Sequence, residues 1–234
     1  MNAAVREEIL IPCLKSLALF KGQSDDLLRF LTAKSELIQV CKGDLICKKG
    51  AHPYGLYCVL EGKVKISVIS HQGNERVLEI VQGGGMFGEA SLIREEPCAM
   101  YAQALDKTQM VFFRRGMVVE AIRRFPEFAL GLLGGMSDRL LRLVRDVEIC
   151  CLQPATDRVV SFILDHARPD GDGGASAEVR LPAGKAIIAS SLNLTPETFS
   201  RELHQLAGRG LIDVENKTIR VHDLAALGGS SRNT

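Results

Sequence analysis

The amino-acid sequence predicts an α+β fold with an N-terminal β-roll, a long helix and a C-terminal winged helix-turn-helix. Three observations predict this class: glycine-punctuated β-branched runs fill residues 36–113, apolar residues follow a 3-4 spacing after Pro126, and the last third alternates helical and β-rich segments. The expected organisation is a β-roll domain at 1–125, a dimerisation helix at 126–152, a winged helix-turn-helix at 153–227 and a tail at 228–234.

The β-roll is predicted from its turn signals. Runs such as GLYCVLEG, KVKISVISHQGN and RVLEIVQGGG end in glycine or asparagine. Such signals recur at intervals of roughly 8–12 residues, which is typical of an all-β roll or barrel. Helical patterns at about residues 4–33 and 115–124 flank this region.

The long helix is expected from Pro126 to about Cys151. An apolar seam with successive spacings of 3, 4, 3 and 4 residues runs along it: Leu133, Met136, Leu140, Leu143 and Val147. This spacing is typical of a two-stranded coiled coil. The seam can be buried within the same chain or against a second copy. Because the preceding β-region already reads as a closed unit, we favour a parallel homodimer.

Pro154 ends the long helix, because proline fixes its own φ and disfavours helical geometry in the residue before it. Beyond this candidate hinge at 152–154, the sequence reads as a helix, a short strand, a short helix, a turn, a second helix and two β-rich runs around a tight turn. This order is the layout of a winged helix-turn-helix, with the helix after the turn as its recognition helix.

The predicted recognition helix has two different faces. Thr195 is a suitable N-cap and Pro196 suits the first helical position. Phe199, Leu203 and Leu206 share the apolar face, while the other face is polar and carries Glu197, Ser200, Arg201 and His204. Arginine can pair bidentately with guanine, and a carboxylate can accept from the cytosine amino group. The alternative is an ordinary amphipathic helix with a solvated polar face, but the capped turn and the following hairpin favour base readout.

Composition limits the function classes. With 234 residues and 46% apolar content the chain can form sizeable cores, and no apolar run is long enough for a membrane span. The net charge of +1, and nine Lys/Arg against ten Asp/Glu in residues 153–234, do not by themselves indicate a nucleic-acid partner. The seven cysteines show no spacing framework, which favours a reducing cytoplasm. P-loop, GxSxG, HExxH and CxxC motifs are absent, so we expect no enzyme.

The chain resembles the Crp/Fnr transcription regulators over nearly its whole length. GMFGEASL in the roll and PETFSRELHQL in the recognition helix carry the resemblance, and the second is similar to the E-x-x-S-R signature of the Fnr side of the family. The resemblance implies a homodimer on double-stranded DNA with a TTGAT…ATCAA-like palindrome, and RNA polymerase as a partner. Its DNA-binding set would be Glu197, Ser200 and Arg201 on bases, with Thr198, His204 and the wing residue Lys217. The motif TPETFSR most resembles the corresponding segment of the Dnr/NnrR regulators of nitrogen-oxide respiration.

The same resemblance marks an effector pocket at Gly88, Glu89 and Cys98. In cyclic-nucleotide-binding members, this glycine lets backbone approach the phosphate, this glutamate bonds the ribose, and an arginine of an R-[ST]-A motif neutralises the phosphate. Cys98 stands in place of that arginine and Met100 in place of the alanine. Loss of a charge-assisted phosphate contact should cost several kcal/mol, as an order of magnitude. We therefore expect Gly88 and Glu89 to serve the fold, and the effector to be an unknown small molecule other than a cyclic nucleotide.

The predicted pocket walls, at Gly88–Leu92, a strand at Cys98–Tyr101 and the long helix near Leu133 and Met136, are mostly apolar and favour an uncharged or largely apolar guest. Resemblance to the Dnr-type regulators makes haem that responds to nitric oxide the leading cofactor hypothesis. Its axial ligand is unassigned, any metal ligands are unknown, and the candidates are His52, His71 and His166.

Most cysteines are expected to be inert small core residues, although Cys150 extends the seam and could face its twin across a dimer. A redox switch through Cys98 or Cys150 is the alternative to haem. Two other functions stay open: a signalling module that acts through protein partners, and a thiol-dependent enzyme using Cys150 and Cys151.

Overall fold

The computed structural model describes residues 3–52, 55–169 and 175–229, and the side chains of these residues except 3–7 and 150. The chain divides into two compact units, Met1–Leu141 and Arg142–Thr234. Within the described residues, no helix is both long and apolar enough to cross a membrane.

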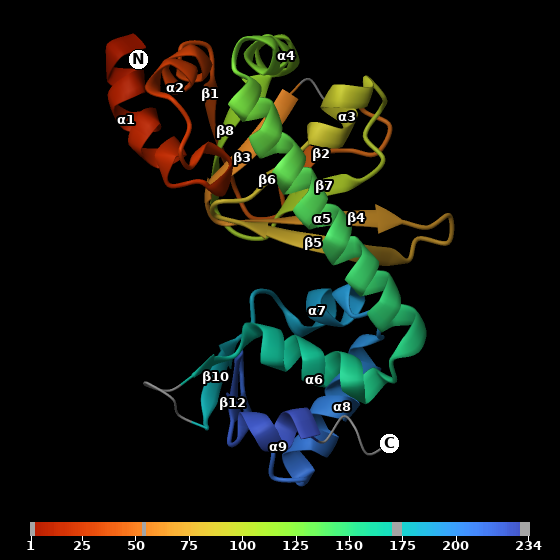
Figure 1. Cartoon of the computed structure of the whole chain (residues 1–234). Coiled ribbons are helices and arrows are strands. Elements are labelled where there is room, and N and C mark those ends of the chain that lie inside the picture. Colours follow the sequence, from red (N-terminus) through yellow and green to blue (C-terminus); the bar gives the residue numbers. More distant parts are fainter. Residues whose placement is uncertain (1–2, 53–54, 170–174, 230–234) are drawn as a thin grey trace. The chain divides into compact units, whose positions relative to one another are not determined.

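The first unit contains the predicted β-roll (Figure 1). Its described strands pair as two four-stranded antiparallel sheets, in the orders β1-β8-β3-β6 and β2-β7-β4-β5. The strands are β1 (Glu36–Val40), β2 (Leu45–Cys47), β3 (Gly55–Glu61), β4 (Lys63–Ile69), β5 (Glu75–Gln82), β6 (Met86–Phe87), β7 (Tyr101–Ala104) and β8 (Thr108–Arg114). Of the strand expected at Cys98–Tyr101, only Tyr101 is in a strand, so that element begins later than predicted.

Helices pack on one end of the roll and share its core. They are α1 (Ala3–Lys15), the 3-10 helix η1 (Ala18–Phe20), α2 (Asp25–Thr32), α3 (Glu89–Arg94) and α4 (Arg115–Arg124). Ser24 caps α2 by accepting a hydrogen bond from the backbone of Leu27 at 3.3 Å. The rings of Phe20 and Phe128 are stacked, and Phe113 meets Phe20 edge-on, so that η1, β8 and the next helix share one core.

The long helix is α5 (Pro126–Leu152), close to its predicted bounds, and the division between the two units falls inside it. Proline at its first position needs no backbone partner there. Phe128 and Leu132 are buried, but further along the helix the apolar side chains of Leu140, Leu143 and Val147 are exposed within the single chain.

The second unit is the predicted winged helix-turn-helix. Its elements are α6 (Ala155–His166), β9 (Arg168–Pro169), β10 (Ala177–Arg180), α7 (Lys185–Ser191), α8 (Pro196–Gly208), β11 (Ile212–Glu215), β12 (Thr218–Val221) and α9 (Leu224–Gly229). The strands form an antiparallel sheet in the order β11-β12-β10-β9. The α6–β10–α7–α8–hairpin order expected from the sequence is thus confirmed (Figure 1).

Candidate nucleic-acid interface and effector pocket

A tight turn sets the direction of α8. Asn193 adopts φ +56°, in the left-handed region that asparagine tolerates, and the backbone of Leu194 bonds back to Ala189 on α7 at 2.9 Å. Thr195 then caps α8, its hydroxyl accepting from the backbone of Thr198 at 3.2 Å. Helix α8 therefore begins as the capping signals predicted.

The inner face of α8 holds the helix in its unit. Phe199, Leu203 and Leu206 are buried, as the spacing predicted. Sequence reasoning missed Glu202, which is only 4% exposed and accepts a hydrogen bond from Thr156 Oγ1 on α6 at 2.7 Å. A buried carboxylate without a partner is costly, so this bond fixes how α8 meets α6. The signal was available, because Glu202 follows Phe199 by three residues and so shares its face.

The outer face of α8 presents the predicted polar stripe. Glu197, Ser200, Arg201 and His204 are exposed and Thr198 is half-buried. Hydrogen bonds from its own backbone N–H and from Thr195 lower the pKa of the Glu197 carboxyl, which therefore remains an acceptor. Arg201 lies with Nη2 3.3 Å from Glu202 Oε1, which engages one of its five donors. Acceptor, hydroxyl and guanidinium thus face outward together.

The wing is the β11–β12 hairpin. Exposed Lys217 lies in its turn after Asn216, whose φ is +51°, and its carbonyl accepts from Leu181 at 2.8 Å. His222, which sequence reasoning did not single out, closes the hairpin. Its Nε2 lies 2.8 Å from Asp213 Oδ2 and its Nδ1 2.9 Å from the Gly210 carbonyl. Bonds to Asp213 and then to that carbonyl raise the pKa of His222, because both ring nitrogens face acceptors.

Arg158 connects the end of α5 to the helix-turn-helix turn, and this residue was also missed. Its Nε donates to the carbonyl of Gln153 at 3.0 Å, and its Nη1 to those of Leu192 and Asn193 at 3.3 and 3.2 Å. The predicted hinge and the turn before α8 are therefore tied by one guanidinium. A lone arginine on a helix gives no sequence signal for these partners.

In the roll, Gly88 has a structural role. It caps α3 with φ +97°, and a Cβ there would lie 2.8 Å from the Gly55 carbonyl oxygen. Only glycine meets both demands without a shift of the backbone. The expectation that Gly88 serves the fold is consistent with this geometry.

Glu89 is tied to the long helix by Arg139, a contact the sequence did not reveal. Glu89 is 4% exposed; its Oε1 pairs with Arg139 Nη1, while its Oε2 is buried without a hydrogen-bond partner among the described residues. Arg139 also donates to the Met86 carbonyl at 2.6 Å, and its Nε lies 3.0 Å from Glu79 Oε2. The guanidinium of Arg139 on α5 thus pairs with the Glu89 carboxylate, the group that bonds the ribose in the cyclic-nucleotide-binding members of the family it resembles.

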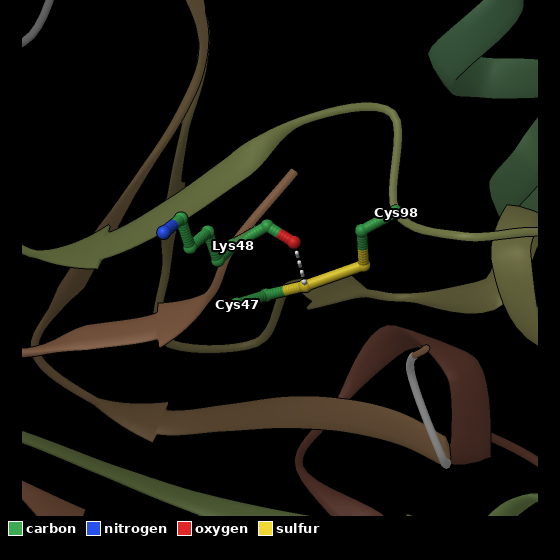
Figure 2. The surroundings of a disulfide bond; sticks show 3 residues. All are labelled: Cys47, Lys48 and Cys98. Atoms are coloured by element: carbon green, nitrogen blue, oxygen red, sulfur yellow. Dashed lines mark hydrogen bonds between the residues drawn. A yellow bond between two sulfur atoms is a disulfide. The ribbon is translucent and has the colours of Figure 1, made fainter. Parts of the chain in front are cut away.

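Cys98 is joined to Cys47 in a disulfide (Figure 2). The expectation that most cysteines are inert small core residues is therefore wrong for this pair, which is 51 residues apart in sequence. The backbone brings the pair together: Gly50 donates to the Cys98 carbonyl and Cys98 to the Ala51 carbonyl, each at 2.8 Å. The spacing of the cysteines in the sequence does not predict this disulfide, because the pairing depends on how the chain folds back on itself.

Among the described residues, Cys13, Cys41, Cys58 and Cys151 are free thiols. Burial and the Glu89 carboxylate raise the pKa of Cys58, so it remains a neutral thiol. Cys151 is exposed, while the side chain of Cys150 lies outside the described residues. His52 and His71 are exposed in the roll, and His166 on α6 makes a 2.9 Å contact with the Phe162 carbonyl. Among the described residues, no cluster of three or more His, Cys, Asp or Glu could hold a metal ion.

Two neighbouring cavities of the first unit share Glu89. The one bounded by Gly88, Cys47, Cys98 and Arg139 measures about 20 Å³. The other measures about 230 Å³ and is lined by Leu56, Glu89, Leu92, Ile93, Val118, Ile122, Ala129, Leu132, Leu133 and Met136. The single pocket expected from the sequence is thus divided, and its larger part lies between α3, α4 and α5. The seam residues Leu133 and Met136 line this part, whereas Leu140, Leu143 and Val147 do not.

Known proteins match both units. A cyclic nucleotide-binding domain model matches residues 37–125, and a Crp-like helix-turn-helix domain model matches residues 157–229. The CRP-like cAMP-activated global transcriptional regulator of Mycobacterium tuberculosis is 26% identical over 216 residues, 92% of this chain and 96% of the relative. The structure of DNR from Pseudomonas aeruginosa is 30% identical, with a TM-score of 0.50, and covers 94% of this chain and 96% of its own. The chain belongs to the Crp/Fnr family.

A CRP/FNR-family transcriptional regulator from Thermus thermophilus shares the fold, with 23% identity, a TM-score of 0.66 and coverage of 85% of this chain and 99% of that one. The roll of this Crp/Fnr regulator is therefore its effector-binding domain, and α8 belongs to its DNA-binding domain. Its family acts in transcription regulation rather than in catalysis.

Proposed function

We propose that this Crp/Fnr regulator binds a TTGAT…ATCAA-like palindrome as a homodimer, with α8 in the major groove. The exposed stripe on a capped helix carries the proposal. Arg201 pairs with O6 and N7 of guanine, Glu197 accepts from a cytosine amino group, and Ser200 bonds a base edge or a phosphate. Arg201 has donors to spare beyond its contact with Glu202.

The remaining members of the DNA-binding set position the helix. Half-buried Thr198 lies next to the stripe, His204 is an exposed member of it, and exposed Lys217 lies in the wing turn. Contacts of this kind with phosphates fix register and orientation without reading sequence. Because the unit has little net charge, Arg201 and Lys217 must supply most of the electrostatic contribution.

The homodimer is supported by the exposed side of α5. Leu140 and Val147 are each 62% exposed in the single chain, and full burial of one such side chain contributes about 1.5–3 kcal/mol. A second copy along the seam would cover them and hold two recognition helices one helical turn of DNA apart, about 34–36 Å. The bound dimer would then present a surface to RNA polymerase, as its family does.

A mobility-shift titration tests the function. The protein should bind a TTGAT…ATCAA duplex at least about 10³-fold more tightly than a scrambled duplex at the same salt concentration. Equal affinity for both would contradict sequence-specific readout. Absence of all DNA binding, with a protein captured through residues 153–229 instead, would support the rival signalling module that acts through protein partners.

The effector is proposed to bind in the roll, but the residues there do not fit haem. Haem iron is held by histidine, cysteine, methionine or tyrosine. Met136 is the only such residue that lines the 230 Å³ cavity. The smaller cavity has Tyr57 and Met100 in its wall and its two cysteines in a disulfide, but its space of about 20 Å³ is far too small for a haem. The histidines suggested as axial ligands lie elsewhere. No haem-dependent step is therefore proposed, nor a cyclic nucleotide, for which a space of 20 Å³ is too small.

A further inference from the structure

The carboxylate of Glu202 lies between helix α6 and Arg201 of helix α8. Its Oε2 accepts a hydrogen bond from Thr156 Oγ1 at 2.7 Å, and its Oε1 lies 3.3 Å from Arg201 Nη2. The Glu202 side chain is 6% exposed, whereas the Arg201 side chain is 60% exposed. The carboxylate thus connects a hydroxyl of α6 with a guanidinium that is open to solvent.

The surroundings of Glu202 on its helix are otherwise apolar. Phe199, Leu203 and Leu206 are buried on the same side of α8. A carboxylate in such a place is costly unless its oxygens are bonded, and an apolar side chain of similar volume is often no less stable there. Stability of the fold therefore does not account for this carboxylate, and its second contact points to Arg201.

Contact with Glu202 restricts Arg201 before DNA binds. Ordering a long, flexible side chain on binding reduces affinity roughly twofold to tenfold. The contact engages one of the five N–H donors of Arg201, and the other four suffice for a bidentate pair with O6 and N7 of guanine. Because the cost of ordering arises only where Arg201 bonds a base, a restrained Arg201 favours the duplex that carries the guanine.

We propose that Glu202 is a positioning residue for base readout: held by Thr156 of α6, it orients Arg201 and so increases the preference of α8 for guanine. The effect on specificity rests on the proposed function, because it requires α8 in the major groove, whereas the restraint on Arg201 exists without DNA. All three residues lie in the second unit, so the arrangement does not depend on how the two units are placed.

The restraint can be measured in the free protein by NMR relaxation on the full chain. The Nε–H of Arg201 should have a higher order parameter than that of Arg209, the exposed residue at the C-terminal end of α8. Thr156→Val should lower the value of Arg201 to that of Arg209, whereas Thr156→Ser, which keeps a hydroxyl, should preserve it. Equal order parameters for the two arginines in the wild type would overturn the proposal.

Base readout can be measured by mobility shifts on the TTGAT…ATCAA duplex and on a duplex in which the guanine–cytosine pair of each half-site is changed to adenine–thymine. Thr156→Val should reduce the preference for guanine roughly twofold to tenfold and leave affinity for the changed duplex unaltered. Glu202→Leu should show the same loss of preference without a loss of stability in urea unfolding, because leucine fills the buried position. Ser161→Ala is the control, because it removes a hydroxyl of α6 that does not bond Glu202.

The outcomes separate positioning from a purely structural role. Wild-type preference in both Thr156→Val and Glu202→Leu, or an equal loss of affinity for every duplex, would overturn the proposal. In an Arg201→Ala background, Thr156→Val should cause no further loss of preference, and an undiminished further loss would contradict the coupling. A wild type that shows the restrained Arg201 but no preference for the palindrome would refute the proposed function and leave the restraint standing.

Discussion

At the residue scale, several side chains act through a partner that the sequence does not indicate. Glu202 is bonded to Thr156, Arg158 to three carbonyls, and His222 to Asp213. Each pair fixes the geometry of a neighbouring functional element. Arg201 differs, because only one of its five N–H donors is engaged, by Glu202, and the others remain available to DNA.

Arg201→Ala should weaken palindrome binding by about 1–3 kcal/mol and relax the preference at the guanine position, since one bidentate base contact is lost. Quantitative mobility shifts on palindromes with single base changes measure both effects. Lys217→Ala is the matched control, because loss of a phosphate contact should weaken all duplexes alike. Wild-type affinity and specificity in Arg201→Ala would show that α8 does not read bases through this residue.

The pKa of His222 should lie above its ordinary value of 6.5 in the folded protein, as measured by proton NMR titration. Asp213→Asn should lower it, while Glu215→Gln on the same strand should not, because Glu215 pairs with Arg220 instead. A group whose folded pKa is raised stabilises the protein fully below its unfolded pKa. That contribution is lost as pH rises through the folded value. The wing should therefore weaken from about pH 6.5 upward, and an unshifted His222 would contradict the bonding.

At the element scale, the roll depends on contacts between segments far apart in the chain. The disulfide joins the end of β2 to the segment that leads into β7, and Arg139 joins α5 to α3 and β5. Both border the 20 Å³ cavity beside Gly88. Changes in either should therefore affect this end of the roll before they affect the helix-turn-helix.

Cys47→Ser should reduce the free energy of unfolding of the oxidised roll by about 2–4 kcal/mol, because the crosslink restricts the unfolded chain. Urea titrations with and without a thiol reductant measure this, and the reductant should have no further effect on the variant. Cys41→Ser, at an exposed free thiol nearby, is the control. Identical unfolding of oxidised wild type and Cys47→Ser would argue against the disulfide.

At the scale of the whole molecule, the main feature is the apolar seam of α5, which a single chain leaves exposed to solvent. Leu140, Leu143 and Val147 are exposed over two turns of a helix that also supplies part of the wall of the 230 Å³ cavity. Association along this seam would place effector site and reading helices in one symmetric assembly.

Leu140→Glu should convert the dimer to monomers and abolish specific binding, because it places a charge in the seam. Light scattering at micromolar concentration and mobility shifts measure the two effects. Arg145→Glu, a change at another exposed position of α5 outside the seam, should remain dimeric. A monomeric wild type that binds the palindrome specifically would refute the dimer.

The sequence by itself determined the order of elements, the fold class and the polar stripe of α8. These depend on periodicity, capping and turn residues, which are local and can be read along the chain. Only the tertiary structure decided that Cys98 pairs with Cys47, that Arg139 reaches Glu89, and that the expected pocket is divided in two. Such contacts join residues about 50 positions apart. Their formation depends on how sheets and helices pack, a property for which single residues carry no periodic signal.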